Sequence, residues 1–330
     1  MKATLEKLFS KEELTQEEAR DTLTKISKGE FPEAQVIAFM TVFLMRDITA
    51  DELSGFRQAL IDLCKKINLE GRDAIDIVGT GGDGKNTFNI STLSSFVVAG
   101  AGYNVAKHGN KGVSSACGSS NVLHHLGYNF TADEDLLKRQ LDKSNICFFH
   151  APLFHPALKG VAPLRKGLGM KTFFNMLGPL VNPAEPRCNL LGVYNEELTD
   201  LYYGVLKNSK KTFTILHAMD GYDEVSLTGE VKLVNESEAM VVAPDYFNLP
   251  TISPSDIYGG ETVEEAAKIF IDILDGRGSE AQRSVIYANA GLAIHCFDRN
   301  KSLSDAIAEA RESLDSGKAR MALNNLIKTQ

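Results

Sequence analysis

Residues 76–92 read Asp-Ile-Val-Gly-Thr-Gly-Gly-Asp-Gly-Lys-Asn-Thr-Phe-Asn-Ile-Ser-Thr, and this stretch decides how the chain is interpreted. The mostly apolar residues 74–78 predict a short buried strand, and four glycines follow within the next six positions. Asn89, Ser91 and Thr92 are favourable helix N-cap residues ahead of an apolar run over 93–98. A strand, a glycine loop and a helix start in this order leave backbone N–H groups that favour an anion, most often phosphate.

A glycine-rich turn of this kind also occurs as a plain tight turn before a capped helix. No Gly-Lys-Ser/Thr closes the loop, and the glycine spacing does not continue as in dinucleotide-binding loops. Asp83 and the hydroxyl and amide side chains that follow it favour a phosphorylated sugar. Amides and hydroxyls bind phosphate oxygens, and a carboxylate binds sugar hydroxyls or a metal-bound water.

The composition limits the classes of function. A chain of 330 residues predicts about two domains, and its net charge of −8 opposes binding to nucleic acid or an anionic membrane. The longest apolar run, residues 36–45, covers about half of a membrane span. The charged N-terminus lacks a signal-peptide core, and the five scattered cysteines show no metal or disulfide spacing. We therefore expect a cytoplasmic protein with reduced thiols.

Residues 1–68 predict helices only. Thr15 with Glu18, and Thr49 with Glu52, have the spacing of capping boxes ahead of apolar periodicity. Pro32 opens another helix between them that is too apolar on all sides for a solvated surface. This apolar helix indicates either a dimer interface or an ordinary helical core.

From residue 73 the pattern changes to short apolar runs that alternate with helices, which predicts an α/β domain. A second strand over 103–107 leads into a loop rich in lysine, serine and glycine, and then into a helix over 122–126. Because the carboxyl ends of parallel strands share one edge, this loop and the first glycine loop should face one crevice. The alternative is a solvated basic turn.

The later part of the chain adds an acidic pair. A third strand over 146–150 precedes a turn-rich connector. A fourth strand over 212–217 is followed by an acidic turn between strands, and this turn contains Asp223-Glu224 and residues 225–228. Adjacent carboxylates near a polyphosphate suit magnesium, although a solvated turn is the alternative. Thr131 with Glu134 caps a further helix ahead of the third strand. We expect the remainder of the chain to be helical cover for the sheet, in segments 262–274, 281–296 and 303–327, with a cap at Thr262.

Five motifs in one order resemble those of the anthranilate phosphoribosyltransferase family. They are Gly79-Thr80-Gly81-Gly82-Asp83, Asn89-Ile90-Ser91-Thr92, Lys107-His108-Gly109-Asn110, Asn175-x-Leu177-Gly178-Pro179-x-x-Asn182-Pro183 and Asp223-Glu224. The resemblance implies a small all-helical domain over 1–70, joined by some helices from about 165–190. It also implies an α/β domain over 71–330 that binds phosphoribosyl pyrophosphate, with a mainly parallel central sheet covered by helices.

The resemblance further implies the reaction, the second step of tryptophan biosynthesis from chorismate. The 5-phosphoribosyl group moves from phosphoribosyl pyrophosphate to the amine of anthranilate, which gives N-(5-phosphoribosyl)anthranilate and pyrophosphate. The expected cofactor is Mg²⁺, and the expected assembly is a homodimer through the helical domain. We expect no nucleic-acid or membrane partner.

The residue roles implied by the resemblance fall into three groups. Phosphoribosyl pyrophosphate is expected to contact Gly79, Gly82, Asp83, Thr87, Asn89, Ile90, Ser91, Thr92, Lys107, Ser115 and Ser119. Anthranilate is expected to contact Gly79, His108, Asn110, Pro152 and Arg165, and magnesium to contact Ser91, Asp223 and Glu224. No residue is a certain catalytic group, because a neutral aniline nitrogen is already nucleophilic.

Two other classes compete with this interpretation. A pyrimidine nucleoside phosphorylase has a similar architecture but does not need the Asp223-Glu224 pair, and its phosphate loop differs from residues 107–110. A nucleic-acid-binding relative should carry basic surface stripes and lack the metal carboxylates. The acidic net charge and the retained pair oppose this second class.

Overall fold

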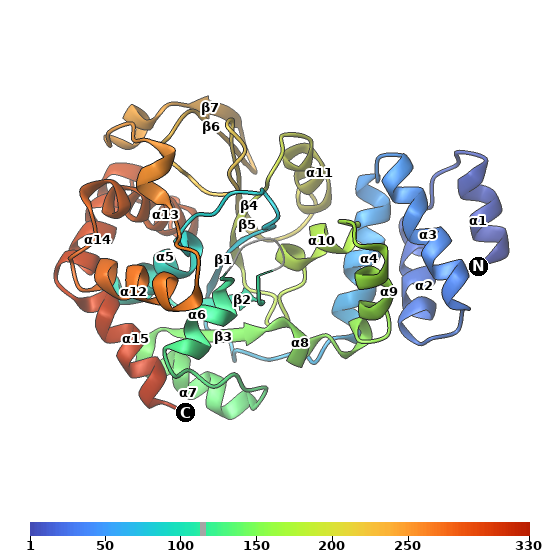
Figure 1. The fold of residues 1–330 in the computed structure, drawn as a ribbon, viewed down its shortest axis with the longest axis horizontal. Helices are drawn as coiled ribbons and strands as arrows, with labels where there is room; N and C mark the ends of the chain where they lie inside the picture. The colour runs from blue at the N-terminus through green and yellow to red at the C-terminus, as the bar shows by residue number, and fades with distance from the viewer. Residues whose placement is uncertain (113–116) are drawn as a thin grey trace.

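The computed structural model describes residues 1–112 and 117–330. A helical unit at the N-terminus sits beside a larger unit built on one sheet (Figure 1). The helical unit contains α1 Lys2–Phe9, α2 Gln16–Ser27, α3 Glu33–Met45 and α4 Ala50–Leu63. Both predicted capping boxes are present and set the first residues of α2 and α4.

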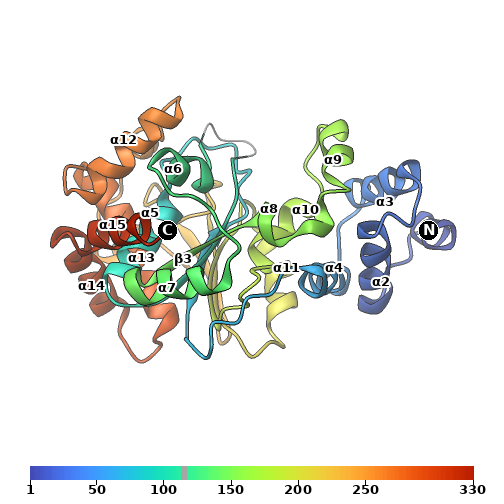
Figure 2. The ribbon, with the colours of Figure 1, turned by 90° about the horizontal axis from the view of Figure 1, so that it is seen from below.

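Aromatic packing joins a later segment to the helical unit. Phe39, Phe43 and Phe56 cluster at its centre, and the ring of Phe173 stacks on Phe56 with centroids 4.5 Å apart. Phe173 lies between α9 (Ala162–Leu168) and α10 (Phe174–Leu177). Figure 2 shows α10 between the N-terminal helices and the sheet, and α9 beside α3. This segment, residues 161–181, therefore forms the wall of the helical unit that faces the sheet.

The sheet has the order β3-β2-β1-β4-β5-β6-β7. Its first five strands are parallel and the last two pairings are antiparallel, as expected for a mainly parallel sheet. The strands are β1 Ile75–Gly79, β2 Val105–Gly109, β3 Ile146–His150, β4 Cys188–Gly192, β5 Thr212–Ala218, β6 Val231–Asn235 and β7 Ala239–Val242.

Alternate residues of the central strands face opposite sides of the sheet. Ile75 and Ile77 pack into the core beneath the C-terminal helices, whereas Val78 and Leu191 pack toward the helical unit. The covering helices are α5 Ile90–Gly100, α6 Ser119–His125, α7 Glu134–Ser144, α8 Ala151–Phe154, α11 Glu197–Leu206, α12 Val263–Leu274, α13 Glu280–Phe297, α14 Leu303–Asp315 and α15 Lys318–Lys328. Short 3-10 turns cover Pro156–Leu158, Gly178–Leu180, Pro244–Phe247 and Pro254–Ile257. Both faces of the parallel strands are thereby removed from water.

Several expected boundaries are wrong. The strand at Thr212 is the fifth, because the buried run Cys188–Gly192 forms β4. Residues 225–228 belong to the turn as expected, whereas the antiparallel strands that follow it, from Val231, interrupt the part of the chain expected to be helical. The expected helix over 303–327 is two helices that meet at Gly317, where φ is +80°.

The cap of α7 also differs from the expectation. Asp133 is its N-cap and accepts a hydrogen bond from the Leu136 N–H, while Thr131 accepts one from the Asp133 N–H. A carboxylate nearer the helix start therefore takes the place of the expected threonine cap. Within the described ranges, no helix combines the length and the apolar character needed to cross a membrane.

A buried carboxylate holds the helical unit together. Glu52 has no exposed surface, and it accepts hydrogen bonds from the Leu14 and Thr49 N–H groups and from Arg46. Burial raises the pKa of Glu52, but these hydrogen bonds outweigh it and hold the pKa below its usual value. The ionised side chain thus connects the α1–α2 loop, α3 and α4.

We predict that Glu52→Ala lowers the free energy of unfolding by about 3 kcal/mol, because it leaves a guanidinium and two N–H groups without their acceptor. Glu18→Ala is the matched control. Glu18 occupies the same capping-box position in α2 but is exposed, so its removal should have a much smaller effect. Urea unfolding at neutral pH measures both variants, and equal effects would contradict the structural role of Glu52.

Candidate active site

A crevice of about 300 Å³ opens at the carboxyl ends of β1 and β2. One wall is made by the two loops that follow these strands, and the opposite wall by residues of the segment 161–181. The sequence prediction that both loops face one crevice is therefore confirmed. The cavity lies between the α/β unit and the helical unit.

The glycine loop needs its glycines for two different reasons. Gly81, Gly82 and Gly84 have φ values of +63°, +75° and +74°, which residues with side chains rarely adopt. Gly79 has another role, since an added Cβ would lie 2.2 Å from Oδ2 of Asp223. The turn and the approach of Asp223 thus explain this part of the motif.

The start of α5 has no side-chain cap among the described residues. Asn89 occupies the N-cap position, but its amide Nδ2 donates to the Cys117 carbonyl oxygen at 3.0 Å. This hydrogen bond connects the first loop to the second. The N–H groups of Ser91 and Thr92 have no acceptor within the described part of the chain, and both residues line the crevice.

The side chain of Asn121 organises the second loop. Its Oδ1 accepts hydrogen bonds from the Gly112 and Gly118 N–H groups at 3.0 and 3.1 Å. An added Cβ on Gly118 would lie 2.1 Å from the Gly112 nitrogen, so these two backbone positions require a glycine at 118. The amide of Asn121 therefore fixes both ends of the loop at the crevice.

The segment that carries the acidic pair passes directly over the strand ends. Asp223 Oδ2 accepts a hydrogen bond from the Gly81 N–H at 2.7 Å, and an added Cβ on Gly192 would lie 1.7 Å from the Asp223 carbonyl oxygen. Asp223 is buried, which differs from the solvated turn considered as the alternative. This carboxylate is part of the fold as well as part of the crevice.

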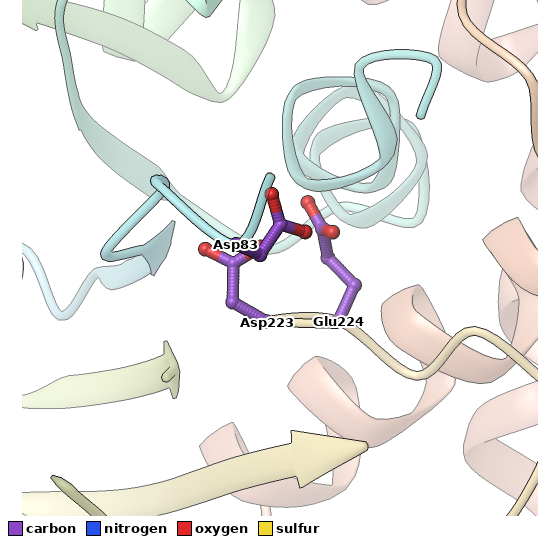
Figure 3. A group of neighbouring side chains, drawn as sticks. All are labelled: Asp83, Asp223 and Glu224. Carbon is purple, nitrogen blue, oxygen red and sulfur yellow. The ribbon is translucent and has the colours of Figure 1, made fainter. Parts of the chain in front are cut away.

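Three carboxylates meet at this point (Figure 3). Oxygens of Asp83, Asp223 and Glu224 all lie within 4.8 Å of one another. Burial, and then the neighbouring Asp223 charge, raise the pKa of Asp83 to about 6. Burial and the two aspartates raise the pKa of Glu224 well above its usual value, and its shielded Oε2 has no hydrogen-bond partner among the described residues. A divalent cation fits this donor set, since it needs oxygen ligands and removes the repulsion.

A buried lysine faces the acidic cluster from the strand below. Lys107 on β2 donates a hydrogen bond from Nζ to the Ile77 carbonyl oxygen at 2.7 Å. Burial lowers the pKa of Lys107, and the charges of Asp76, Glu224 and Asp223 oppose that shift. The crevice floor thus carries one positive group held in a fixed place.

Two neutral histidines lie toward the helical unit. Burial lowers the pKa of His108 to about 3 and that of His155 to about 4, and their ring centroids are 5.4 Å apart. Nδ1 of His108 lies 3.0 Å from the Gly178 carbonyl oxygen, so we assign the proton to Nδ1 and leave Nε2 as an acceptor. The side of the crevice near Arg165 therefore carries little competing charge.

Arg165 is the charged group of this side. Its Nη2 lies 3.5 Å from Oδ1 of Asn175, and its guanidinium carbon lies 5.2 Å from the Phe174 ring centroid. Burial lowers the pKa of Arg165, yet the group remains a cation near neutral pH. No carboxylate within the described ranges raises the pKa of Arg165 against this effect of burial. The guanidinium is therefore available to an anionic ligand.

The crevice brings together most of the residues singled out by sequence, which are Gly79, Gly82, Asp83, Thr87, Asn89, Ser91, Thr92, Lys107, His108, Asn110, Ser119, Arg165, Asp223 and Glu224. Ile90 and Pro152 are not among the lining residues, because Ile90 is buried in the core and Pro152 is exposed on α8. Ser115 lies outside the described residues. Sequence reasoning missed Lys85, His155 and Lys171, and no local pattern marks them.

Comparisons with known proteins show which family this chain resembles. Two glycosyl transferase family models match the chain, the helical bundle domain over residues 2–64 and the a/b domain over residues 71–320. The anthranilate phosphoribosyltransferase of Cytophaga hutchinsonii is 53% identical over 328 residues, which cover 99% of this chain and all of that protein. The relative from Christiangramia forsetii is 52% identical over 97% of this chain and 96% of that protein.

Solved structures show the same similarity. The anthranilate phosphoribosyltransferase (TrpD) of Thermus thermophilus matches with a TM-score of 0.92 at 31% identity, over 98% of each chain. The enzyme of Saccharomyces cerevisiae, solved in complex with PRPP and Mg, matches with a TM-score of 0.91 at 27% identity, over all of this chain and 98% of that one. The chain belongs to the anthranilate phosphoribosyltransferase family.

Proposed function

We propose that the crevice is the place where this chain transfers the 5-phosphoribosyl group from phosphoribosyl pyrophosphate to the amine of anthranilate. The products are N-(5-phosphoribosyl)anthranilate and pyrophosphate, in the second step of tryptophan biosynthesis from chorismate. The observation that carries the assignment is the cluster of Asp83, Asp223 and Glu224 beside a glycine loop and an uncapped helix start. A nucleoside phosphorylase or a nucleic-acid-binding protein has no need for such a cluster.

The reaction separates charge along one bond. Breaking the bond between C1 of the ribose and the pyrophosphate oxygen builds positive charge on the sugar and negative charge on the leaving group. The protein must therefore hold the pyrophosphate with fixed positive groups and hold the amine in line with C1. Lys107 and the N–H groups at the start of α5 supply fixed positive ends on one side of the crevice.

Magnesium is the cofactor, and the chain's own residues suit it. Asp223 and Glu224 would hold the ion with Ser91, and Asp83 is close enough to join them directly or through water. When bound, Mg²⁺ neutralises charge on the pyrophosphate. The unpartnered Oε2 of Glu224 supports this assignment, because a shielded carboxylate oxygen otherwise lacks any compensation.

The acceptor side of the crevice suits a small aromatic acid. Arg165 would bind the carboxylate of anthranilate, and Asn110 and Gly79 line the same crevice together with the phosphate loops. Nε2 of His108 can accept a hydrogen bond from an amine N–H. Both histidines are neutral at neutral pH, so the aniline nitrogen is not protonated by its surroundings.

The magnesium assignment predicts opposite effects of Glu224→Gln on stability and on turnover. The melting temperature should stay the same or rise, because the variant removes one of three mutually repelling charges. Turnover at saturating substrates should fall about 100-fold, because a cation ligand is lost. Loss of anthranilate fluorescence in the presence of phosphoribosyl pyrophosphate measures turnover, and differential scanning calorimetry measures stability.

Asp223→Ala is the contrasting variant, because it also removes the acceptor of the Gly81 N–H and should lower the melting temperature. A chelator should abolish wild-type turnover, and excess Mg²⁺ should restore it. Wild-type turnover without any divalent cation would refute the magnesium role. Unchanged turnover of Glu224→Gln would remove Glu224 from the ligand set.

The Arg165 assignment predicts a substrate-selective loss. Arg165→Ala should raise the KM for anthranilate about 100-fold and should leave the KM for phosphoribosyl pyrophosphate within about twofold, since one bidentate ion pair is lost. Arg165→Lys should recover only part of the affinity, because an ammonium lacks the planar fork. Equal increases in both KM values would show that Arg165 does not contact the anthranilate carboxylate.

We further propose a cytoplasmic homodimer that forms through the helical unit. Phe9 and Met45 in this unit leave 64% and 84% of their surface exposed. The helices that carry them, α1 and α3, belong to the end of the molecule away from the C-terminal helices (Figure 1). Such exposure of large apolar side chains is typical of an interface, and α3 is apolar on all sides.

Met45→Glu should convert this dimer to a monomer, because a charge in an apolar interface is costly to bury. Met321→Glu on α15 is the control, since this methionine is 55% exposed on the other unit. Light scattering after size-exclusion chromatography gives the mass of each variant. A monomeric wild type, or a dimer that survives Met45→Glu unchanged, would contradict the proposed interface.

A further inference from the structure

Lys171 lies on the wall of the crevice that belongs to the helical unit. It follows Gly169, which ends α9 with a φ of +63°, and it comes two residues before Phe173. Phe173 is buried against Phe39 and Phe56 in the centre of the helical unit. The backbone of Lys171 is therefore anchored to the helical unit, while its side chain lines the crevice.

The side chain of Lys171 reaches the glycine loop. Its Nζ donates a hydrogen bond to the Gly82 carbonyl oxygen and lies 4.9 Å from the centroid of the Tyr194 ring. An added Cβ on Gly82 would lie 3.3 Å from Cε of Lys171, so the loop backbone and the lysine are in close contact. Among the described residues, this is the hydrogen bond that joins a side chain of the helical unit to residues 80–84.

Lys171 also differs from the other lysines of the crevice in its origin. Lys85, Lys107 and Lys111 come from the loops or strands of the α/β unit. Lys107 is committed to the Ile77 carbonyl oxygen, and Lys85 lies over the Tyr222 ring. Within the described part of the chain, Lys171 is the lysine that the opposite wall contributes.

We propose that Lys171 is a positioning residue for the diphosphate of phosphoribosyl pyrophosphate, acting through the Gly82–Asp83 peptide. The carbonyl and the N–H of a trans peptide point in opposite directions. Holding the Gly82 carbonyl oxygen on Lys171 therefore fixes the direction of the Asp83 N–H, and it also places the Asp83 carboxylate in the acidic cluster. The inference rests on the proposed function, because it names the ligand of the same crevice.

This contact makes the loop depend on the position of the helical unit. When the two walls are close, the ammonium of Lys171 holds the loop in the geometry that receives the diphosphate. When the walls separate, residues 81–84 lose that restraint, and their three glycines give them wide conformational freedom. Affinity for the diphosphate substrate is thus coupled to the spacing of the two walls.

The test measures substrate binding directly, without anthranilate. Isothermal titration calorimetry with phosphoribosyl pyrophosphate and Mg²⁺ should give a Kd about tenfold higher for Lys171→Met than for the wild type. The reason is that the variant loses one charge-assisted hydrogen bond. Lys171→Arg should stay within about threefold of the wild type, because it keeps a cationic donor.

Lys166→Met is the matched control, since Lys166 is exposed on α9 and does not line the crevice. It removes the same charge from the same segment and should leave the Kd unchanged. Hydrogen exchange without substrate should be faster at residues 80–84 in Lys171→Met and unchanged in Lys166→Met. Equal Kd values for Lys171→Met and wild type, or equal losses in both methionine variants, would overturn the proposal. A wild type that does not bind phosphoribosyl pyrophosphate would instead overturn the proposed function.

Discussion

The passage of residue 223 across the ends of β1 and β4 is the constraint on which the rest of the site depends. The backbone of Asp223 lies so near Gly192, and its carboxylate so near Gly79, that neither strand end tolerates a Cβ. The same carboxylate accepts the Gly81 N–H and so fixes the glycine loop. One close contact thus aligns two strand ends, one loop and the acidic pair, which lie far apart in sequence.

This arrangement places like charges in a region shielded from water, where their repulsion is unfavourable. Opposite charges placed between them reduce that repulsion. Asp76 on β1 has its pKa raised by burial to about 6, even though it accepts hydrogen bonds from the His108 N–H and from Asn182 Nδ2. Lys107 attracts both Asp76 and Glu224. At the crevice the negative charge of the acidic cluster exceeds the nearby positive charge, and a bound cation would balance it. Stability and ligand binding are therefore in tension at the acidic cluster.

Local signals in the sequence predicted the elements that depend on local chemistry. The capping boxes at Thr15 and Thr49 and the strand Ile146–His150 needed only neighbouring residues to be recognised. The strand Cys188–Gly192 was missed, because five buried residues without alternation give no period to detect. The break at Gly317 was missed because the apolar pattern continues through it.

The same distinction applies to the site, where some features depend on adjacent residues and others on contacts between distant parts of the chain. The glycine loop and the acidic pair were recognisable from sequence, since each carries its chemistry within a few adjacent residues. The joining of Asp83 to Glu224 was not, because it depends on how the sheet brings a loop beside a segment some 140 residues later. Lys171 is the extreme case, since its contact with Gly82 exists only when two separately packed units meet. A crevice between two units therefore draws its specific chemistry from contacts that no local pattern encodes, which is why the opposite wall was the part that sequence reasoning described least.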